Sequence, residues 1–527
     1  MDTYLIANGG CGERLTSVML MLYQSKFYGE SDPIKGVLII DNDSTNPANV
    51  RLNNIVNAVN NMNEAIGRIE FPPIKADVWA PKIGDAQSLA NLQSTNPEME
   101  ALSLIATTEE LQQTIEGKGY AGHVNIGVTL VNTALEMQNN TNSKVLYDFL
   151  DGACPKHGGG EARFIIIGST HGGTGAALNT AIAKKIRSYY QGNPARIDVF
   201  GLFMLSYYSI PPKEDENEND SRDKIHIDTN QFRPADIEAL EGYRGMNLIN
   251  AQDPVFDNIL FCGYDPRPLT SLEHREGGNK QDNKFSIPEL LMCAGANFIF
   301  KGGVSRNEYL GINLQNEFDG TIRWSNVPYG EELKRCLGGM GLFACSITEE
   351  TKDASWNKWL TNKIGGFGVW GGMYFMTESN KTEEEPKFKD TKKCITDFVV
   401  EYWRMLYQIS THYKGAWNAK VALLKNTAFG KRPDLNGFAW IDDNMVDATI
   451  INFDGNVYNA GGNTPNMFSI NNIFKAELNN FSDANKNKLK MQIRTDSEVS
   501  DRKKAYFHAL FEACYKTYGD NKGEGDN

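Results

Sequence analysis

A glycine-rich run between a buried strand and a helix constrains this chain more than any other feature. The apolar residues 163–167 lead into Gly168–Ala176, and residues 177–187 have the composition of a helix. Glycines lack a Cβ and let backbone N–H groups converge on an anion, and the helix N-terminus adds a partial positive charge. The run therefore predicts a phosphate-binding loop formed by Gly172, Gly173, Thr174 and Gly175.

A second strand–glycine–helix unit opens the chain. Residues 3–7 predict a strand, residues 8–13 a turn and residues 14–23 a helix. The turn does not complete the dinucleotide fingerprint G-x-G-x-x-G, because Leu15 occupies the third glycine position. A Rossmann-type dinucleotide enzyme is thus the weaker alternative. The predicted phosphate-binding residues of this turn are Gly10, Cys11 and Gly12.

Two further segments belong to the same pattern. The apolar strand 36–40 runs into Asp41, Asn42 and Asp43, and the cluster 117–127, with Gly119 and Gly122, precedes a helical pattern. Loops that follow parallel strands meet at one edge of the sheet. The segments therefore predict several loops that close on one polyphosphate.

Together these loops resemble those of the tubulin/FtsZ superfamily. Gly9–Arg14 is similar to the tubulin loop G-Q-C-G-N-Q, and residues 117–127 resemble the third loop of FtsZ. Residues 171–177 resemble G-G-G-T-G-[ST]-G, with His171 and Ala177 in place of glycines. The resemblance is strong over residues 1–206. It implies a divergent bacterial tubulin-like protein that binds GTP or GDP with Mg²⁺.

The resemblance also implies a domain organisation and an α/β fold. A Rossmann-like nucleotide-binding domain with a parallel sheet is expected over residues 1–284, followed by a long core helix over 285–301. An enlarged second α+β domain is expected over 302–518 and a disordered tail over 519–527. A chain of 527 residues is too long for a single core, which agrees with this division.

The residues that would read the base match the family less well. Tyr264 or Phe298 has an aromatic face for stacking, and Asp265 or Asn297 has hydrogen-bonding groups for a base edge. The competing interpretation, which the sequence favours, is that Cys293 and Phe298 belong to the core. Guanine specificity is therefore implied by the resemblance alone, and the choice between guanine and adenine stays open.

The loop that would supply catalytic carboxylates also departs from the family. In FtsZ, N-x-D-x-x-D orients water on the γ-phosphate of a neighbouring subunit. Here Pro328 occupies the first acid position, and Glu331, with Glu332 beside it, the second. A general base must reach the water that it activates. The alternative is that both glutamates merely begin a helix, where the dipole favours acids.

Composition excludes several classes of protein. The net charge of −13, without a sustained basic stripe, argues against a nucleic-acid-binding protein. No apolar run of 18 residues predicts a membrane span. The eight cysteines are dispersed without a C-x-x-C pair, which predicts a reduced cytoplasmic protein, and no protein metal site is expected.

The sequence thus predicts a GTP-binding protein that assembles head to tail into filaments, with slow hydrolysis at the interface between subunits. The alternative is a nucleotide-binding scaffold or switch with little hydrolysis, which binds another protein through the second domain. The sequence does not decide whether the chain is an enzyme.

Overall fold

The structure is a computed structural model of the 527-residue chain. The described residues are 1–43, 46–68, 71–81, 90, 124–136, 143–156, 158–209, 232–249, 254–263, 270–271, 283–302, 308–313, 327–347 and short stretches within 394–409, 420–421, 451–452 and 507–516.

The described part contains a seven-stranded parallel sheet in the order β3-β2-β1-β4-β5-β7-β9. The α/β class and the Rossmann-like parallel sheet are therefore confirmed. Because the register pairs Asn8 with Ile40 and Ala7 with Ile167, the carboxyl ends of the central strands lie at one edge. The strands are β1 (Asp2–Asn8), β2 (Ile34–Ile40), β3 (Lys75–Trp79), β4 (Glu161–Ser169), β5 (Arg196–Met204), β7 (Asn258–Gly263) and β9 (Glu308–Asn313).

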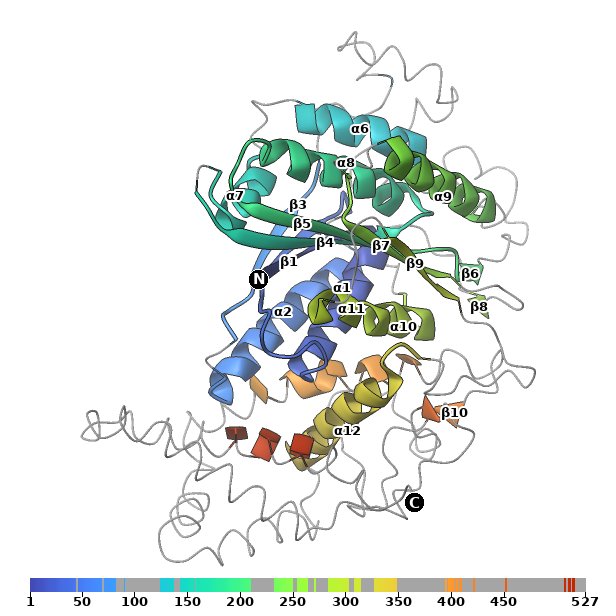
Figure 1. The fold of residues 1–527 in the computed structure, drawn as a ribbon. Coiled ribbons are helices and arrows are strands. Elements are labelled where there is room, and N and C mark those ends of the chain that lie inside the picture. The colour runs from blue at the N-terminus through green and yellow to red at the C-terminus, as the bar shows by residue number, and fades with distance from the viewer. Residues whose placement is uncertain are drawn as a thin grey trace, which may run out of the picture. The chain divides into compact units, whose positions relative to one another are not determined.

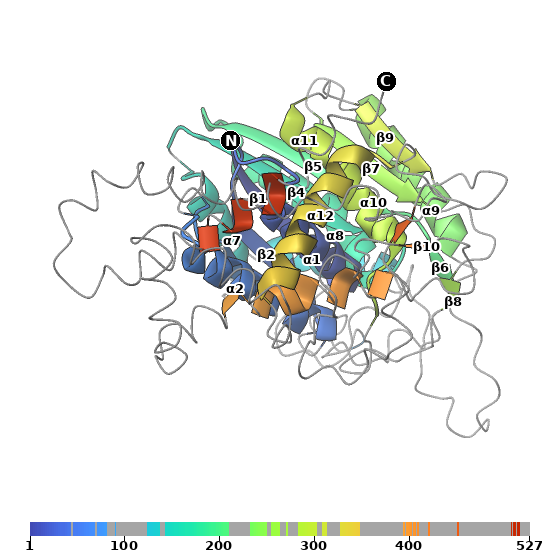
Figure 2. The ribbon, with the colours of Figure 1, turned by 90° about the horizontal axis from the view of Figure 1, so that it is seen from below.

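Helices cover both faces of this sheet (Figures 1 and 2). On one face lie α6 (Val124–Glu136), α7 (Lys144–Ala153), α8 (Gly173–Tyr189) and α9 (Phe232–Ile249). On the other lie α1 (Gly9–Gln24), α2 (Pro47–Ala65), α10 (Ile287–Gly295) and α11 (Asn297–Lys301). Two short parallel strands, β6 (Tyr208–Ser209) and β8 (Thr270–Ser271), pair with each other.

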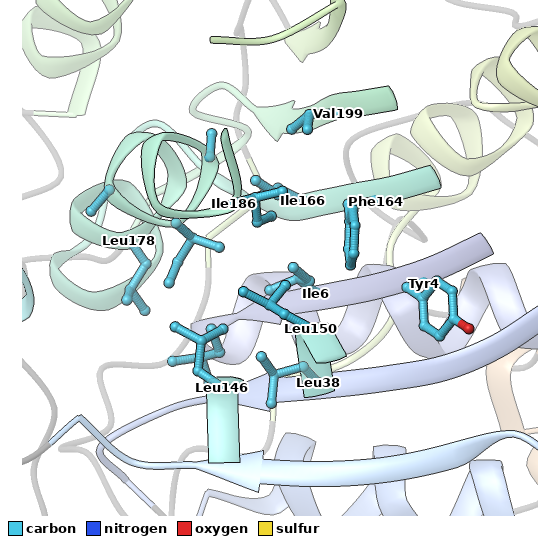
Figure 3. Close-up of a cluster of buried hydrophobic side chains, with 14 of the residues drawn as sticks. Tyr4, Ile6, Leu38, Leu146, Leu150, Phe164, Ile166, Leu178, Ile186 and Val199 are labelled. Atoms are coloured by element: carbon cyan, nitrogen blue, oxygen red, sulfur yellow. The ribbon is translucent and has the colours of Figure 1, made fainter. Parts of the chain in front are cut away.

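The strands form because their side chains are apolar on both sides. Sheets covered by helices on both faces have strands that read as continuous hydrophobic runs, and β4 is buried from Ala162 to Ser169. Tyr4, Ile6, Phe164 and Ile166 project from the sheet into one core with side chains of α7 and α8 (Figure 3). This packing fixes the strand ends from which the loops emerge.

The predicted core helix is present as two nearly continuous helices, α10 and α11. Every residue of α10 is buried, as expected for a helix between two layers. Ser286 precedes its first turn, and the carboxylate of Glu289 accepts a hydrogen bond from the Ser286 N–H at 2.9 Å. This is one of the orphan N–H groups that a helix start must satisfy.

The chain divides into two compact units. One consists of residues 1–20, 28–56 and 72–315, and the other of residues 21–27, 57–71 and 316–527. Within the second unit the structure describes α12 (Gly330–Ile347) and two-residue strands β10 (Lys420–Val421) and β11 (Ile451–Asn452), which pair antiparallel. Most of the predicted second domain and the predicted tail lie outside the described residues. Among the described residues no helix is long and apolar enough to cross a membrane.

Candidate functional site

The carboxyl ends of β1, β2, β4 and β5, with the N-termini of α1 and α8, form what we call the strand-end site. Helix α8 begins at Gly173, directly after Gly172, whose φ of 90° lies in a region that favours glycine. The first N–H groups of a helix have no partner within it, so α8 offers unpaired donors and its positive dipole end. This geometry suits an anion.

Helix α1 brings a second glycine-led N-terminus to the same place. It begins at Gly9, with a φ of 65°, so the residues predicted as a turn already form its first turn. A Cβ at Gly9 would lie 3.2 Å from the backbone nitrogen of Gly175 and 3.2 Å from the Cβ of Thr174. A Cβ at Gly12 would overlap the carbonyl oxygen of Ile167 in β4. The two helix starts therefore pack directly against each other.

A buried amide pair fixes the strand ends beneath them. The Asn8 side chain at the end of β1 donates to Asn179 Oδ1 at 3.0 Å, and Asn179 Nδ2 donates to the carbonyl oxygen of Ser169 at 3.0 Å. Asn8 and Asn179 are both fully buried. The sequence reasoning missed this pair, although an asparagine in the apolar face of a helix is a signal for it.

A cluster of acidic and amide side chains lies where the carboxyl end of β2 meets the first turns of α1 and α2. Asp41 accepts hydrogen bonds from the Asp43 N–H at 3.1 Å and from Asn46 Nδ2 at 3.4 Å. Glu13 accepts one from Asn49 Nδ2 at 3.2 Å. Among the described residues, Glu13 Oε2 has no hydrogen-bond partner although the side chain is fully buried.

Burial dominates the electrostatics of this cluster. It raises the pKa of Asp41 to about 7, against the hydrogen bonds from Asp43 and Asn46. Burial, and next the charge of Asp41, raises the pKa of Glu13 well above its usual value. The two carboxyl groups therefore hold protons more readily than exposed acids do, and a bound cation would favour their charged forms.

A buried ion pair links α1 to the start of α10. Arg14 Nε donates to Glu289 Oε1 at 2.8 Å, and the Tyr207 hydroxyl donates to the same oxygen at 2.7 Å. Arg14 also donates to Tyr207 at 2.8 Å and to the carbonyl oxygen of Gly10 at 3.2 Å. Cys11 Sγ lies 3.8 Å from the Tyr207 hydroxyl. Sequence reasoning gave none of these partners, because 275 residues separate Arg14 from Glu289.

A second carboxylate, Asp236 of α9, holds the segments that follow β4 and β5. It accepts hydrogen bonds from the Thr170 hydroxyl at 2.5 Å and from the Ser206 N–H at 2.7 Å. His171 Nδ1 lies 3.5 Å from Asp236 Oδ1. The predicted phosphate loop is thus anchored from outside its own strand and helix.

The structure describes the base-reading candidates only in part. Asn297 is the first residue of α11 and is fully buried. Cys293 donates its S–H to the carbonyl oxygen of Leu15, and the Phe298 ring packs edge-on against Phe200, so both belong to the core. Gly119, Gly122, Tyr264 and Asp265 lie outside the described residues.

The catalytic candidates Glu331 and Glu332 occupy the first turn of α12, in the second unit. Pro328 and Tyr329 precede this helix, and Tyr329 has a φ of 52°. Such a left-handed backbone is uncommon for a bulky residue and concentrates at functional sites.

Within the described part of the chain, no group of three or more His, Cys, Asp or Glu side chains is placed to hold a metal ion. No protein-family model, curated protein or solved structure matches the chain. The tubulin/FtsZ resemblance therefore stays a prediction.

Proposed function

We propose that this chain is a tubulin/FtsZ-like protein that binds GTP at the strand-end site and assembles head to tail in the cytoplasm. One observation carries the nucleotide-binding part of the proposal: two glycine-led helix N-termini, from α1 and α8, pack against each other at the carboxyl edge of a parallel sheet. The choice of GTP and the head-to-tail assembly rest on the tubulin/FtsZ resemblance of the sequence. Two sets of free N–H groups and two helix dipoles that share one position suit a polyphosphate better than a single phosphate.

The packing of the glycines supports this assignment. A Cβ at Gly175 would lie 3.1 Å from the carbonyl oxygen of Asn8, and a Cβ at Gly10 would lie 2.9 Å from Asn46 Nδ2. A side chain at Gly175 would press on the end of β1, and a side chain at Gly10 would displace the amide of Asn46. The residues proposed to bind the phosphates are Gly10, Cys11, Gly12, Gly172, Gly173, Thr174 and Gly175.

The acidic cluster fits a hard cation bound together with the nucleotide. Mg²⁺ prefers oxygen ligands and keeps several waters, so it needs only one or two protein carboxylates. Glu13 Oε2 and Asn42 Oδ1 are buried oxygens without hydrogen-bond partners among the described residues. Glu13, Asp41 and Asn42 would hold Mg²⁺ or its waters, and the ion would neutralise phosphate charge.

Hydrolysis would depend on the loop that precedes α12 and on the first turn of this helix. Glu331 or Glu332 would act on the nucleotide of a neighbouring subunit, and the left-handed backbone of Tyr329 favours a functional role for this loop. The runner-up is a nucleotide-dependent switch or scaffold with little hydrolysis, which binds another protein through the second domain. Pro328 favours this runner-up, because its side chain cannot activate water.

Nucleotide binding is tested by Gly173→Val. A branched side chain at the first residue of α8 enters the proposed phosphate position, so affinity for labelled GTP and GDP should fall by at least tenfold. Gly152→Val is the matched control, because nothing lies within 4 Å of a Cβ at this helical position. A folded Gly173→Val protein that binds GTP and ATP as the parent does would show that the site is assigned wrongly.

Assembly is tested separately by sedimentation and electron microscopy with GTP, with ATP and without nucleotide. A head-to-tail contact that repeats without closure generates a filament. We expect filaments at high protein concentration with GTP or a slowly hydrolysed analogue. Monomers under every nucleotide and salt condition, with binding intact, would favour the switch or scaffold.

A further inference from the structure

The hydroxyl of Tyr207 lies where three segments of the chain meet behind the start of α1. Tyr207 follows β5, and its side chain is buried, with 4% exposed. Near its oxygen lie Arg14 Nη2 at 2.8 Å, Glu289 Oε1 at 2.7 Å and Cys11 Sγ at 3.8 Å. Cys11 and Arg14 belong to the first two turns of α1, and Glu289 belongs to the first turn of α10. One hydroxyl thus joins the glycine-led start of α1 to the start of α10.

The protons available at this hydroxyl decide the direction of each hydrogen bond. A tyrosine hydroxyl donates one proton and accepts through two lone pairs, whereas a guanidinium only donates. Arg14 therefore uses one lone pair, and Glu289, its ion-pair partner, receives the hydroxyl proton. The second lone pair is left for the S–H of Cys11. Burial raises the pKa of Tyr207 well above its usual value and that of Cys11 to about 12, so both groups keep their protons.

The same contacts fix the plane of the Arg14 guanidinium. Its Nε donates to Glu289 and its Nη2 to Tyr207, while Nη1 donates to the carbonyl oxygen of Gly10 at 3.2 Å. Because the guanidinium is a rigid fork, the positions of two nitrogens determine that of the third. The carboxylate of Glu289 is itself held by the Ser286 N–H at 2.9 Å. The cation is therefore held firmly against the turn that is proposed to bind phosphate.

The first turn of α1 needs such contacts from outside, because glycines provide none of their own. Gly10 and Gly12 have no side chains, and glycine loses more backbone freedom than other residues when it is ordered. Groups that bind a ligand do so best when supporting hydrogen bonds already hold them in place. Tyr207 supplies this support at two points, since it holds the side chain of Cys11 directly and the carbonyl oxygen of Gly10 through Arg14.

We propose that Tyr207 is a positioning residue for phosphate binding: its hydroxyl holds Cys11 and Arg14, and thereby sets the first turn of α1 in the arrangement that accepts a nucleotide phosphate. The proposal rests on the proposed nucleotide site and adds to it a residue that no sequence pattern singled out. In this role the hydroxyl acts through its two partners on α1 and not by contact with the phosphate.

Tyr207→Phe tests this role because it keeps the ring and removes only the hydroxyl. Arg14 and Cys11 then lose a buried acceptor, so GDP should bind ~3- to 10-fold more weakly in a calorimetric titration. Tyr28→Phe is the matched control. Tyr28 is also 4% exposed, but its hydroxyl donates to the carbonyl oxygen of Cys293 in α10, at 2.8 Å. This control should leave the affinity for GDP unchanged.

A second ligand separates positioning from a general loss of structure. Guanosine has the base and ribose of GDP but no phosphate, so its binding does not depend on the first turn of α1. Its affinity, measured by competition with labelled GDP, should be equal in Tyr207→Phe and the parent. A substitution that only loosened the surrounding structure would weaken the binding of both ligands by the same factor.

The role of Tyr207 would be overturned if Tyr207→Phe bound GDP as the parent does, or if Tyr28→Phe or guanosine showed the same loss. These results would leave the nucleotide site standing, whereas no GDP binding by the parent would overturn the proposed function as well. Arg14→Lys replaces Tyr207→Phe if that protein does not fold. Lysine keeps the charge beside Glu289 but lacks the fork that reaches Gly10 and Tyr207 together. The same selective loss of GDP affinity is expected, and parental affinity would overturn the proposal.

Discussion

The geometry of the buried ion pair between Arg14 and Glu289 predicts how much stability is lost when one partner is removed. The side chains are 6% and 0% exposed, and their atoms lie 2.8 Å apart. Arg14→Met removes the cation and leaves the Glu289 carboxylate buried with hydrogen bonds from only Tyr207 and Ser286. Breaking a buried pair in this way costs ~3–5 kcal/mol.

An exposed ion pair provides the matched comparison. Lys144 and Asp148 face each other one helical turn apart on α7, with side chains 71% and 54% exposed. Lys144→Met makes the same kind of substitution in water and should cost at most ~0.5 kcal/mol. The free energies of unfolding are measured by urea denaturation with circular dichroism.

A second substitution separates charge from packing. In Arg14→Met/Glu289→Gln the unpaired charge is gone, so the double variant should recover part of the stability lost in Arg14→Met. The reasoning would be refuted if Arg14→Met cost no more stability than Lys144→Met. It would also be refuted if the double variant lost the sum of what Arg14→Met and Glu289→Gln lose separately.

Three further predictions follow from the same structure. Gly12→Ala should lose ~1–3 kcal/mol of stability, because its Cβ would overlap a carbonyl oxygen of β4. Gly152→Ala is the control: its Cβ meets nothing within 4 Å, so this variant should gain up to ~1 kcal/mol of stability from helix propensity. Equal melting temperatures for Gly12→Ala and Gly152→Ala would contradict the packing argument. Folding raises the pKa of Asp41 from 3.8 to about 7, so the folded parent binds more protons than the unfolded chain and loses stability as pH rises through this range. The Asp41→Asn side chain does not titrate, so the stability of this variant relative to the parent should rise by up to ~4 kcal/mol as pH increases through this range. Free energies of unfolding from urea denaturation below and above the range test this, and a stability difference that does not change with pH would show that Asp41 does not titrate as inferred. Glu331→Gln should abolish slow, concentration-dependent GTP hydrolysis, a loss of ~10²–10⁴-fold, while binding and assembly persist. Parental activity in Glu331→Gln/Glu332→Gln would place the catalytic group elsewhere.

The sequence by itself determined the local architecture. Apolar runs followed by polar or glycine-rich turns predicted β1, β2 and β4, and the helical patterns predicted α1 and α8, because strand burial and helix starts depend on neighbouring residues. The position of Gly172–Gly175 at the start of α8 follows from these local rules. Two helix starts differed from the prediction, since α1 begins at Gly9 and α8 begins at Gly173, each within the predicted glycine turn.

Tertiary structure decided which side chains surround those loops. Glu289 and Asp236 are ordinary helix residues in the sequence, and their roles arise because the fold brings them to Arg14, across 275 positions, and to Thr170, across 66. Burial then changes their chemistry, because a carboxylate removed from water must find a cation, a proton or several hydrogen bonds. No local pattern contains that information, since the partner of a buried charge is chosen by packing between elements and not by spacing along the chain.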